Sequence, residues 1–141
     1  MTKIDEIKLI IYTDGGSRGN PGPAASGVVI FDDKKKLVGE YSEYLGETTN
    51  NQAEYRAIVL ALEKAIELGG KNIILYSDSE LVVNQLNRKY KVKDPGLSTL
   101  FVRIWNSAQN FDSIEYHHIP REKNKLADAQ VNKCLDERLA N

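Results

Sequence analysis

One stretch decides the fold: Ile7-Lys8-Leu9-Ile10-Ile11-Tyr12-Thr13-Asp14-Gly15-Gly16-Ser17-Arg18-Gly19-Asn20-Pro21-Gly22-Pro23. Residues 7–12 form a short apolar run rich in β-branched side chains, which is typical of a strand covered on both faces. The four glycines and two prolines that follow in residues 13–23 predict a loop whose backbone can approach a ligand closely. Asp14 is therefore expected at the edge of a central sheet, where open α/β sheets bind ligands.

The composition limits the possible classes of protein. A chain of 141 residues with 41% hydrophobic and 28% charged residues predicts a single globular domain over residues 1–141. The net charge of −1 argues against binding nucleic acid by overall charge, although basic residues outnumber acidic ones in residues 88–125. The only cysteine, Cys134, is expected to pack in a helix and fits a reducing compartment. No segment has the pattern of a signal peptide or a membrane span, so we expect a soluble cytoplasmic protein.

The rest of the chain predicts further strands and helices. Strands are expected at 25–31, 37–45, 73–76 and 114–119, and helices at 51–68, 80–88, 97–109 and 124–139. The strand, helix, strand order makes the strand at 73–76 parallel to the one at 7–12. In the last helix, Leu126, Val131 and Leu135 are the expected inward residues. The pattern predicts an α/β fold, a mixed sheet with helices packed on it.

Two of these strands end alike, in Thr13-Asp14 and in Ser77-Asp78. Parallel neighbouring strands lie about 4.8 Å apart, so the two carboxylates are expected to face each other. Such anions need a proton or a cation between them. Glu54 and Asp128 are the acids expected to complete an all-oxygen site for Mg²⁺ or Mn²⁺. Two ions in such a site can activate water for phosphodiester cleavage.

Each acid also has a simpler interpretation. Asp14 before glycine is typical of a turn, and Asp78 of a helix cap. Residues 51–54 have the spacing of a capping box that ends in Glu54, and Asp128 alone resembles any solvated helix acid. The metal site is favoured because two matched aspartates end two similar strands and the other acids are spaced to converge on them.

Three blocks carry a resemblance to a known family: Thr13 to Pro23, Thr48 to Glu54, and Ser77 to Glu80. They resemble the successive signature blocks of ribonuclease HI, and the similarity runs from about residue 7 to residue 139. The resemblance implies a five-stranded mixed sheet of order 3-2-1-4-5, with strand 2 antiparallel and helices on both faces. It also implies endonucleolytic hydrolysis of the RNA strand of RNA/DNA hybrids, which leaves a 5′-phosphate and a 3′-hydroxyl.

The resemblance also assigns roles to residues. It implies that Asp14, Glu54, Asp78 and Asp128 are the catalytic carboxylates and hold two Mg²⁺ ions, with Mn²⁺ as an alternative. Substrate contacts are expected from Gly15, Gly16, Ser17, Asn20, Thr49, Asn50, Gln52, Ser79 and Arg121. Short side-chain amides such as those of Asn20 and Asn50 can hydrogen-bond to 2′-hydroxyls in a shallow minor groove. A structural role in a turn or a helix cap is an equal alternative for them. Thr49 matches a position that contacts the DNA-strand phosphate.

Some positions depart from the bacterial pattern. Many bacterial members carry a histidine in a longer loop before the last helix, whereas residues 120–123 form a short connection without one. The large basic protrusion is also missing, so the chain resembles the archaeal-type subset. Arg121 is expected near the scissile phosphate instead. His117 and His118 lie in the last predicted strand, where a packing or hydrogen-bonding role is expected.

Three function classes follow from these patterns. The first is a metal-dependent nuclease that acts on RNA/DNA hybrids as a monomer and without a membrane. The second is a non-catalytic nucleic-acid-binding module of the same fold, which the presence of all four acids disfavours. The third is a nucleotide-binding protein, which is disfavoured because the glycine-rich segment lacks both the G-x-G-x-x-G and the G-x-x-x-x-G-K-[ST] spacing.

Overall fold

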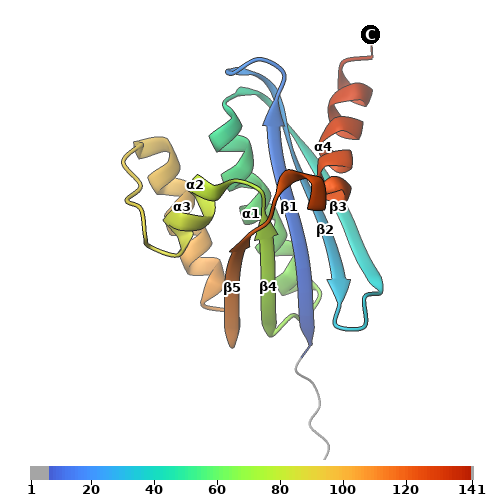
Figure 1. The fold of residues 1–141 in the computed structure, drawn as a ribbon, viewed down its shortest axis with the longest axis vertical. Coiled ribbons are helices and arrows are strands. Elements are labelled where there is room, and N and C mark those ends of the chain that lie inside the picture. The colour runs from blue at the N-terminus through green and yellow to red at the C-terminus, as the bar shows by residue number, and fades with distance from the viewer. Residues whose placement is uncertain (1–6, 141) are drawn as a thin grey trace, which may run out of the picture.

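A single five-stranded sheet organises the computed structural model, which describes residues 7–140. The strands are β1 Lys8–Ser17, β2 Gly22–Asp32, β3 Leu37–Thr48, β4 Asn72–Ser77 and β5 Ser113–His118. The helices are α1 Asn50–Glu67, α2 Glu80–Leu86, α3 Pro95–Ala108 and α4 Lys125–Arg138, with a 3₁₀ turn, η1, at Arg121–Lys123. The order β3-β2-β1-β4-β5 confirms the expected topology (Figure 1). β2 runs antiparallel to both of its neighbours, whereas β1, β4 and β5 are parallel.

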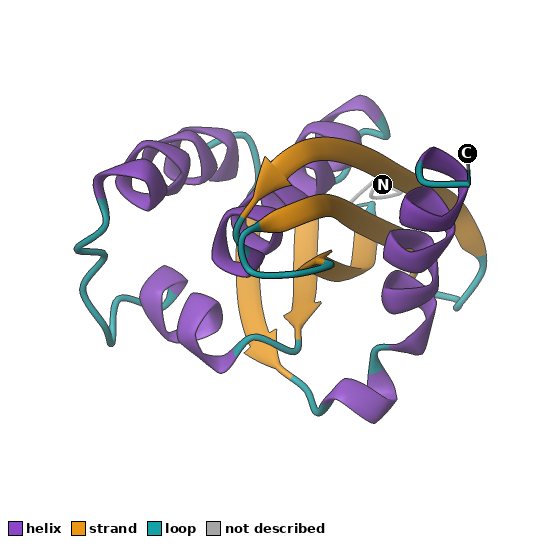
Figure 2. Cartoon of the chain, turned by 90° about the horizontal axis from the view of Figure 1, so that it is seen from above, coloured by secondary structure: helices purple, strands orange, loops and turns teal. Residues whose placement is uncertain are grey.

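Helices cover both faces of the sheet (Figure 2). α1 packs on β1 and β2 and also contacts α3, while α4 packs on β1, β2 and β3. The larger core lies under α1, where Ile11, Ile58 and Leu75 are fully buried. Each such side chain contributes about 1.5–3 kcal/mol through its burial. This core fixes α1 against β1, which carries Asp14, and includes Leu75 of β4, the strand that leads to Asp78.

The glycine-rich segment differs from its prediction. β1 does not end at Tyr12 but continues to Ser17, because Gly15 and Gly16 pair with Ser26 and Ala25 of β2. Only the parallel pairing with β4 stops early, at Thr13 and Ser77. The antiparallel ladder continues past that point because extended glycine keeps its backbone hydrogen bonds and lets another backbone approach closely.

α4 contains one further difference, and β5 decides between the two roles expected for its histidines. Val131 and Leu135 are buried as predicted, but Leu126 is 54% exposed, so its inward assignment was wrong. Leu126 lies in the first turn of α4, where it borders an open groove rather than the core. His117 and His118 are both exposed, so of the two roles expected for them the structure shows hydrogen bonding rather than burial in the core. His117 does form a hydrogen bond, at 2.8 Å to Glu115.

Cys134 is half-buried against the small cluster of Ala25, Val131 and Leu135, as its predicted packing role requires. None of the helices within residues 7–140 combines the length and the apolar character that a membrane span requires. The cytoplasmic location stays a prediction.

Candidate active site

Three carboxylates meet at one edge of the sheet, at the carboxyl ends of β1 and β4. Asp14, Glu54 and Asp78 each offer an oxygen, and these oxygens all lie within 4.8 Å of one another. Asp14 and Glu54 are each only 8% exposed. The matched strand ends therefore converge as the sequence predicted, and α1 brings the third acid to them.

The structure excludes the simpler interpretations of these acids. Asp14 lies within β1 rather than in a turn. The helix that follows Asp78 is capped by Ser79, whose side chain accepts from the Val82 amide. α1 is capped by Thr49, which accepts from the Gln52 amide at 3.2 Å, so Glu54 is not part of a capping box.

The fourth predicted acid lies close by but outside this group of three. Asp128, in the first turn of α4, lines the same cavity as Asp14, Glu54 and Asp78, which has a volume of about 520 Å³. The negative charge of Asp128 contributes to the raised pKa of Asp14. Asp128 therefore lines the site from α4.

The electrostatics of the site are unfavourable without a cation. Burial, then the charges of Asp78 and Asp128, raise the pKa of Asp14 to about 8. Burial also raises the pKa of Glu54 well above its ordinary value, and the charges of Asp14 and Asp78 add to this rise. Close anions in a partly dry site cannot all ionise unless a positive charge joins them.

Two buried oxygens support a cation in this place. Glu54 Oε1 and Asn124 Oδ1 are buried and accept no hydrogen bond from any described residue. Buried polar atoms without partners are rare, and each indicates a missing ligand or water. A donor set made only of oxygens suits a hard divalent cation. The residues present therefore fit the metal ions that the sequence predicted.

Asn124 is a site residue that the sequence analysis missed. It precedes α4, yet its side chain makes no cap hydrogen bond. Its amide instead donates to the Thr13 carbonyl at 2.8 Å and to Asp78 Oδ2 at 3.1 Å, which ties the ends of β1 and β4 to α4. An asparagine at a helix start predicts a cap, so nothing in the sequence signalled this role.

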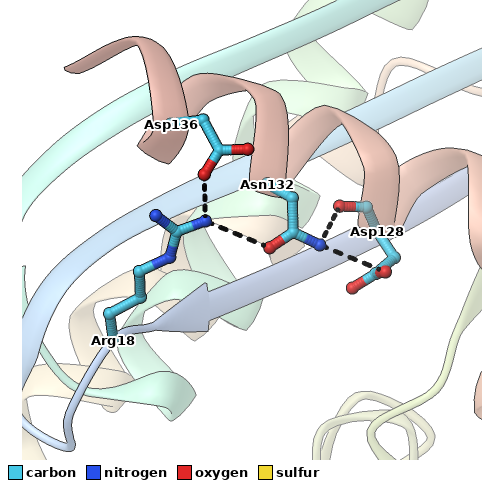
Figure 3. Close-up of polar contacts among 4 residues, drawn as sticks. All are labelled: Arg18, Asp128, Asn132 and Asp136. Carbon is cyan, nitrogen blue, oxygen red and sulfur yellow. Dashed lines mark hydrogen bonds and ion pairs between the residues drawn. The ribbon is translucent and has the colours of Figure 1, made fainter. Parts of the chain in front are cut away.

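A polar network links the loop after β1 to the fourth acid (Figure 3). Arg18 pairs with Asp136 at 2.7 Å and lies 3.5 Å from Asn132 Oδ1. The Asn132 amide in turn contacts Asp128, at 3.2 Å to its carbonyl and 3.3 Å to Oδ2. Asn132 therefore orients the Asp128 carboxylate from one turn further along α4.

The predicted substrate residues divide into two groups. Five of them line the cavity with the acids: Gly15, Gly16, Ser17, Asn50 and Arg121. The side-chain oxygen of Asn50 accepts from the backbone amide of Ser17 at 2.9 Å. The backbone amide of Asn50 donates to Asn20 Oδ1 at 3.0 Å, so Asn20 is joined to a residue that lines the cavity. The other three do not line the cavity: Thr49 and Ser79 are helix caps, and the Gln52 amide lies against Gly96 of α3.

A pH dependence of stability follows from Asp14. Its pKa is 3.8 in the unfolded chain and about 8 in the folded protein, so the folded form holds an extra proton between these values. Its contribution to stability is complete below pH 3.8 and is lost as the pH rises through about 8. We expect the metal-free protein to lose up to about 1.4 kcal/mol per pH unit from this group.

Urea unfolding in EDTA at pH 6 and at pH 8 measures this effect. The Asp14→Asn variant should lose less stability than the wild type between the two pH values, because it has no carboxyl to ionise. Equal losses in the two proteins would contradict the raised pKa.

Comparisons with known proteins show which sequences and structures this chain resembles. The family model described as "Reverse transcriptase-like" matches residues 12–134. Ribonuclease HI of Halobacterium salinarum is 44% identical over 89% of this chain and 63% of its own length. Ribonuclease H of Ruthia magnifica is 34% identical over 92% of this chain and 96% of its own. A bifunctional protein of Mycobacterium tuberculosis is 40% identical, and the chain spans only 36% of its length.

Solved structures agree with these sequence matches. The crystal structure of RNase H1 from Halobacterium salinarum has a TM-score of 0.90 at 42% identity, over 92% of this chain and 98% of that one. The crystal structure of LC11-RNase H1 in complex with an RNA/DNA hybrid has a TM-score of 0.89 at 46% identity, over 93% and 99% of the two chains.

Proposed function

Since this chain belongs to the ribonuclease H family, we propose that it is an endonuclease that hydrolyses the RNA strand of RNA/DNA hybrids. The observation that carries the proposal is the convergence of Asp14, Glu54 and Asp78 within 4.8 Å. The hybrid bound to the similar LC11-RNase H1 supports the choice of substrate. We also propose that residues 1–141 act as one catalytic domain and that the protein is a monomer.

The proposed mechanism assigns the four acids to two divalent ions, with Mg²⁺ preferred and Mn²⁺ an alternative. Asp14 of β1, Glu54 of α1 and Asp78 after β4 would hold these ions together with Asp128 of α4. Divalent ions in this place would supply the electrophile that activates water and stabilises charge on the leaving oxygen. The oxygen of water bonds to phosphorus as the bond from phosphorus to the 3′-oxygen breaks, and protonation of the leaving oxygen gives a 3′-hydroxyl beside a 5′-phosphate.

Other residues of the chain position the RNA strand. The backbone of Gly15 and Gly16 forms the cavity floor beside Asp14, and Arg121 stands at its rim. Arg121 lines the same cavity as the four acids, so its guanidinium is placed to bind the phosphate being cleaved. Asn20 and Asn50 are joined by a hydrogen bond at the rim, where their amides suit the 2′-hydroxyls of a shallow minor groove.

Labelled substrates test the proposal. The protein is incubated with an RNA/DNA hybrid and with matched RNA and DNA duplexes, in Mg²⁺ and in EDTA. We expect cleavage of the hybrid's RNA strand in Mg²⁺ and no cleavage in EDTA. Tight binding of the hybrid without turnover would favour the non-catalytic module, and cleavage that persists in EDTA would overturn the metal-dependent mechanism.

Replacing Asn132 tests the positioning of Asp128. Asn132→Ala removes the amide that holds this carboxylate, and partners of metal ligands contribute about 10–100-fold to activity. We expect kcat to fall by about tenfold or more while KM changes little, since Asn132 is a positioning residue rather than a ligand. Lys133→Gln, on the neighbouring position of α4, is the matched control. An unchanged kcat in Asn132→Ala would contradict the role.

A further inference from the structure

The face of the sheet that carries α4 also holds a row of aromatic rings. Phe31 of β2, Tyr12 of β1, Tyr76 of β4 and His117 of β5 lie next to one another across four strands, with ring centroids 6.0, 5.1 and 5.8 Å apart in that order. Tyr12 and Tyr76 are stacked, with 22° between their planes. α4 packs on β1, β2 and β3, so it does not cover β4 and β5 on this face (Figure 1).

Three of these rings, those of Phe31, Tyr12 and Tyr76, line an open groove of about 560 Å³. Ile10, Tyr12, Phe31 and Tyr76 line the floor, and the exposed Leu126 forms one wall. The volume lies within the range of small-molecule and cofactor sites, about 300–1,000 Å³. Neither tyrosine hydroxyl forms a hydrogen bond with a residue in the range 7–140, so both are available to a ligand.

The charged residues of the groove are mostly basic. Lys35 comes from the turn between β2 and β3, whereas Lys123 and Lys125 come from η1 and α4. Glu122 is the one acid among the residues that line the groove. Lysines therefore stand on separate elements at the margins of an aromatic floor, an arrangement that suits a ligand with flat rings and several negative charges.

Single-stranded nucleic acid has this chemistry. Its bases stack on aromatic side chains, including those on the open face of a sheet, and its phosphates pair with nearby lysines. Tyr12 precedes Asp14 by two residues within β1, so its side chain lies on the same face of the sheet as that acid. η1 borders both sites, since Arg121 lines the cavity of the acids whereas Glu122 and Lys123 line the groove.

We propose that this groove is a second nucleic-acid site, in which one or two unpaired nucleotides stack on Tyr12 and Tyr76 while Lys35, Lys123 and Lys125 bind their phosphates. The site takes a single strand rather than the hybrid duplex. The proposal concerns binding alone, so it does not depend on the four acids being catalytic.

Fluorescence anisotropy of labelled octamers of uridine and of thymidine, in EDTA, tests the proposal. EDTA removes divalent ions, which prevents hydrolysis and leaves the carboxylates of the active site to repel phosphate. The binding that is measured is therefore binding in the groove. We expect saturable binding whose logarithm falls with the logarithm of salt at a slope of about −2, from three lysines. A preference for the RNA octamer or the DNA octamer identifies which unpaired strand the site takes.

Variants separate stacking from a structural role of the rings. Tyr76→Val removes a ring but keeps strand propensity, and it should weaken binding at least about fivefold, whereas Tyr76→Phe keeps the ring and should bind like the wild type. Lys35→Gln should reduce the slope by about 0.7, and Lys133→Gln, outside the groove, should not change it. Because Lys35 is exposed in a turn, this variant remains decisive if Tyr76→Val fails to fold.

Some results would overturn the proposal. These are the absence of saturable binding, equal affinities of the wild type, Tyr76→Val and Lys35→Gln, or self-association in sedimentation that Tyr76→Val removes. The last would show that a second copy of the chain occupies the groove. Hydrolysis of the hybrid without binding of the octamers would overturn this site alone, and binding without hydrolysis would overturn the proposed function alone.

Discussion

Replacing Asp14 by asparagine is expected to reduce hydrolysis of the hybrid more than about 100-fold. Partners that only orient metal ligands contribute about 10–100-fold, so loss of a carboxylate from the ligand set itself should exceed that range. The fold should persist, because burial and the charges of Asp78 and Asp128 already disfavour the ionised form of Asp14. Initial rates in Mg²⁺ and the urea unfolding midpoint measure the two effects.

A matched control keeps this prediction specific. Asp112→Asn removes an exposed acid from the loop before β5, at the end of the sheet opposite the active-site acids. It should leave both the rate and the midpoint unchanged. Mg²⁺-dependent cleavage by Asp14→Asn at near wild-type rate would show that this carboxylate is not needed. A fall in both rate and midpoint would indicate a structural role instead.

Replacing Gly15 by alanine is expected to have the largest effect on stability. A Cβ at this position would lie 2.2 Å from the carbonyl carbon of Ala53 and 2.4 Å from the amide nitrogen of Glu54, both backbone atoms of α1. Backbone cannot move aside as a flexible side chain can, so α1 must shift away from β1. We expect a loss of about 3 kcal/mol or more in the free energy of unfolding.

The neighbouring glycine provides the comparison. A Cβ on Gly16 would meet only Val131 Cγ1 at 3.7 Å, an ordinary contact, so Gly16→Ala should change stability by less than about 1 kcal/mol. Urea unfolding of the two variants under the same conditions checks the difference. Equal effects would mean that glycine's flexibility in the unfolded chain, and not the close approach of α1, decides the cost at Gly15.

Local patterns in the sequence predicted the sheet and the meeting of Asp14 and Asp78. Two apolar runs that end alike, joined by a strand, helix, strand crossover, have few possible arrangements, and the parallel one places both aspartates at one edge. Glu54 was added as an acid of the helix predicted at 51–68, and its role in the site was implied by the resemblance to ribonuclease HI. These features depend on short segments and on chain order, which the sequence displays directly.

Features that depend on contacts between distant segments were not predictable in the same way. Gly15 and Gly16 suggest a loop when read alone, and only the presence of β2 on one side and α1 on the other makes them part of a strand. Asn124 suggests a cap, and its bonds to Thr13 and Asp78 require three elements to be in place. Leu126 has helical spacing, but α4 extends past the part of the sheet that it covers.

The account depends most on divalent ions bound by the converging acids, and anomalous scattering from crystals soaked in Mn²⁺ tests this directly. We expect a strong peak between the carboxylates of Asp14, Glu54 and Asp78, and its loss in crystals of Asp14→Asn treated in the same way. Well-ordered crystals in which Mn²⁺ occupies other surface acids but leaves this group empty would contradict the account.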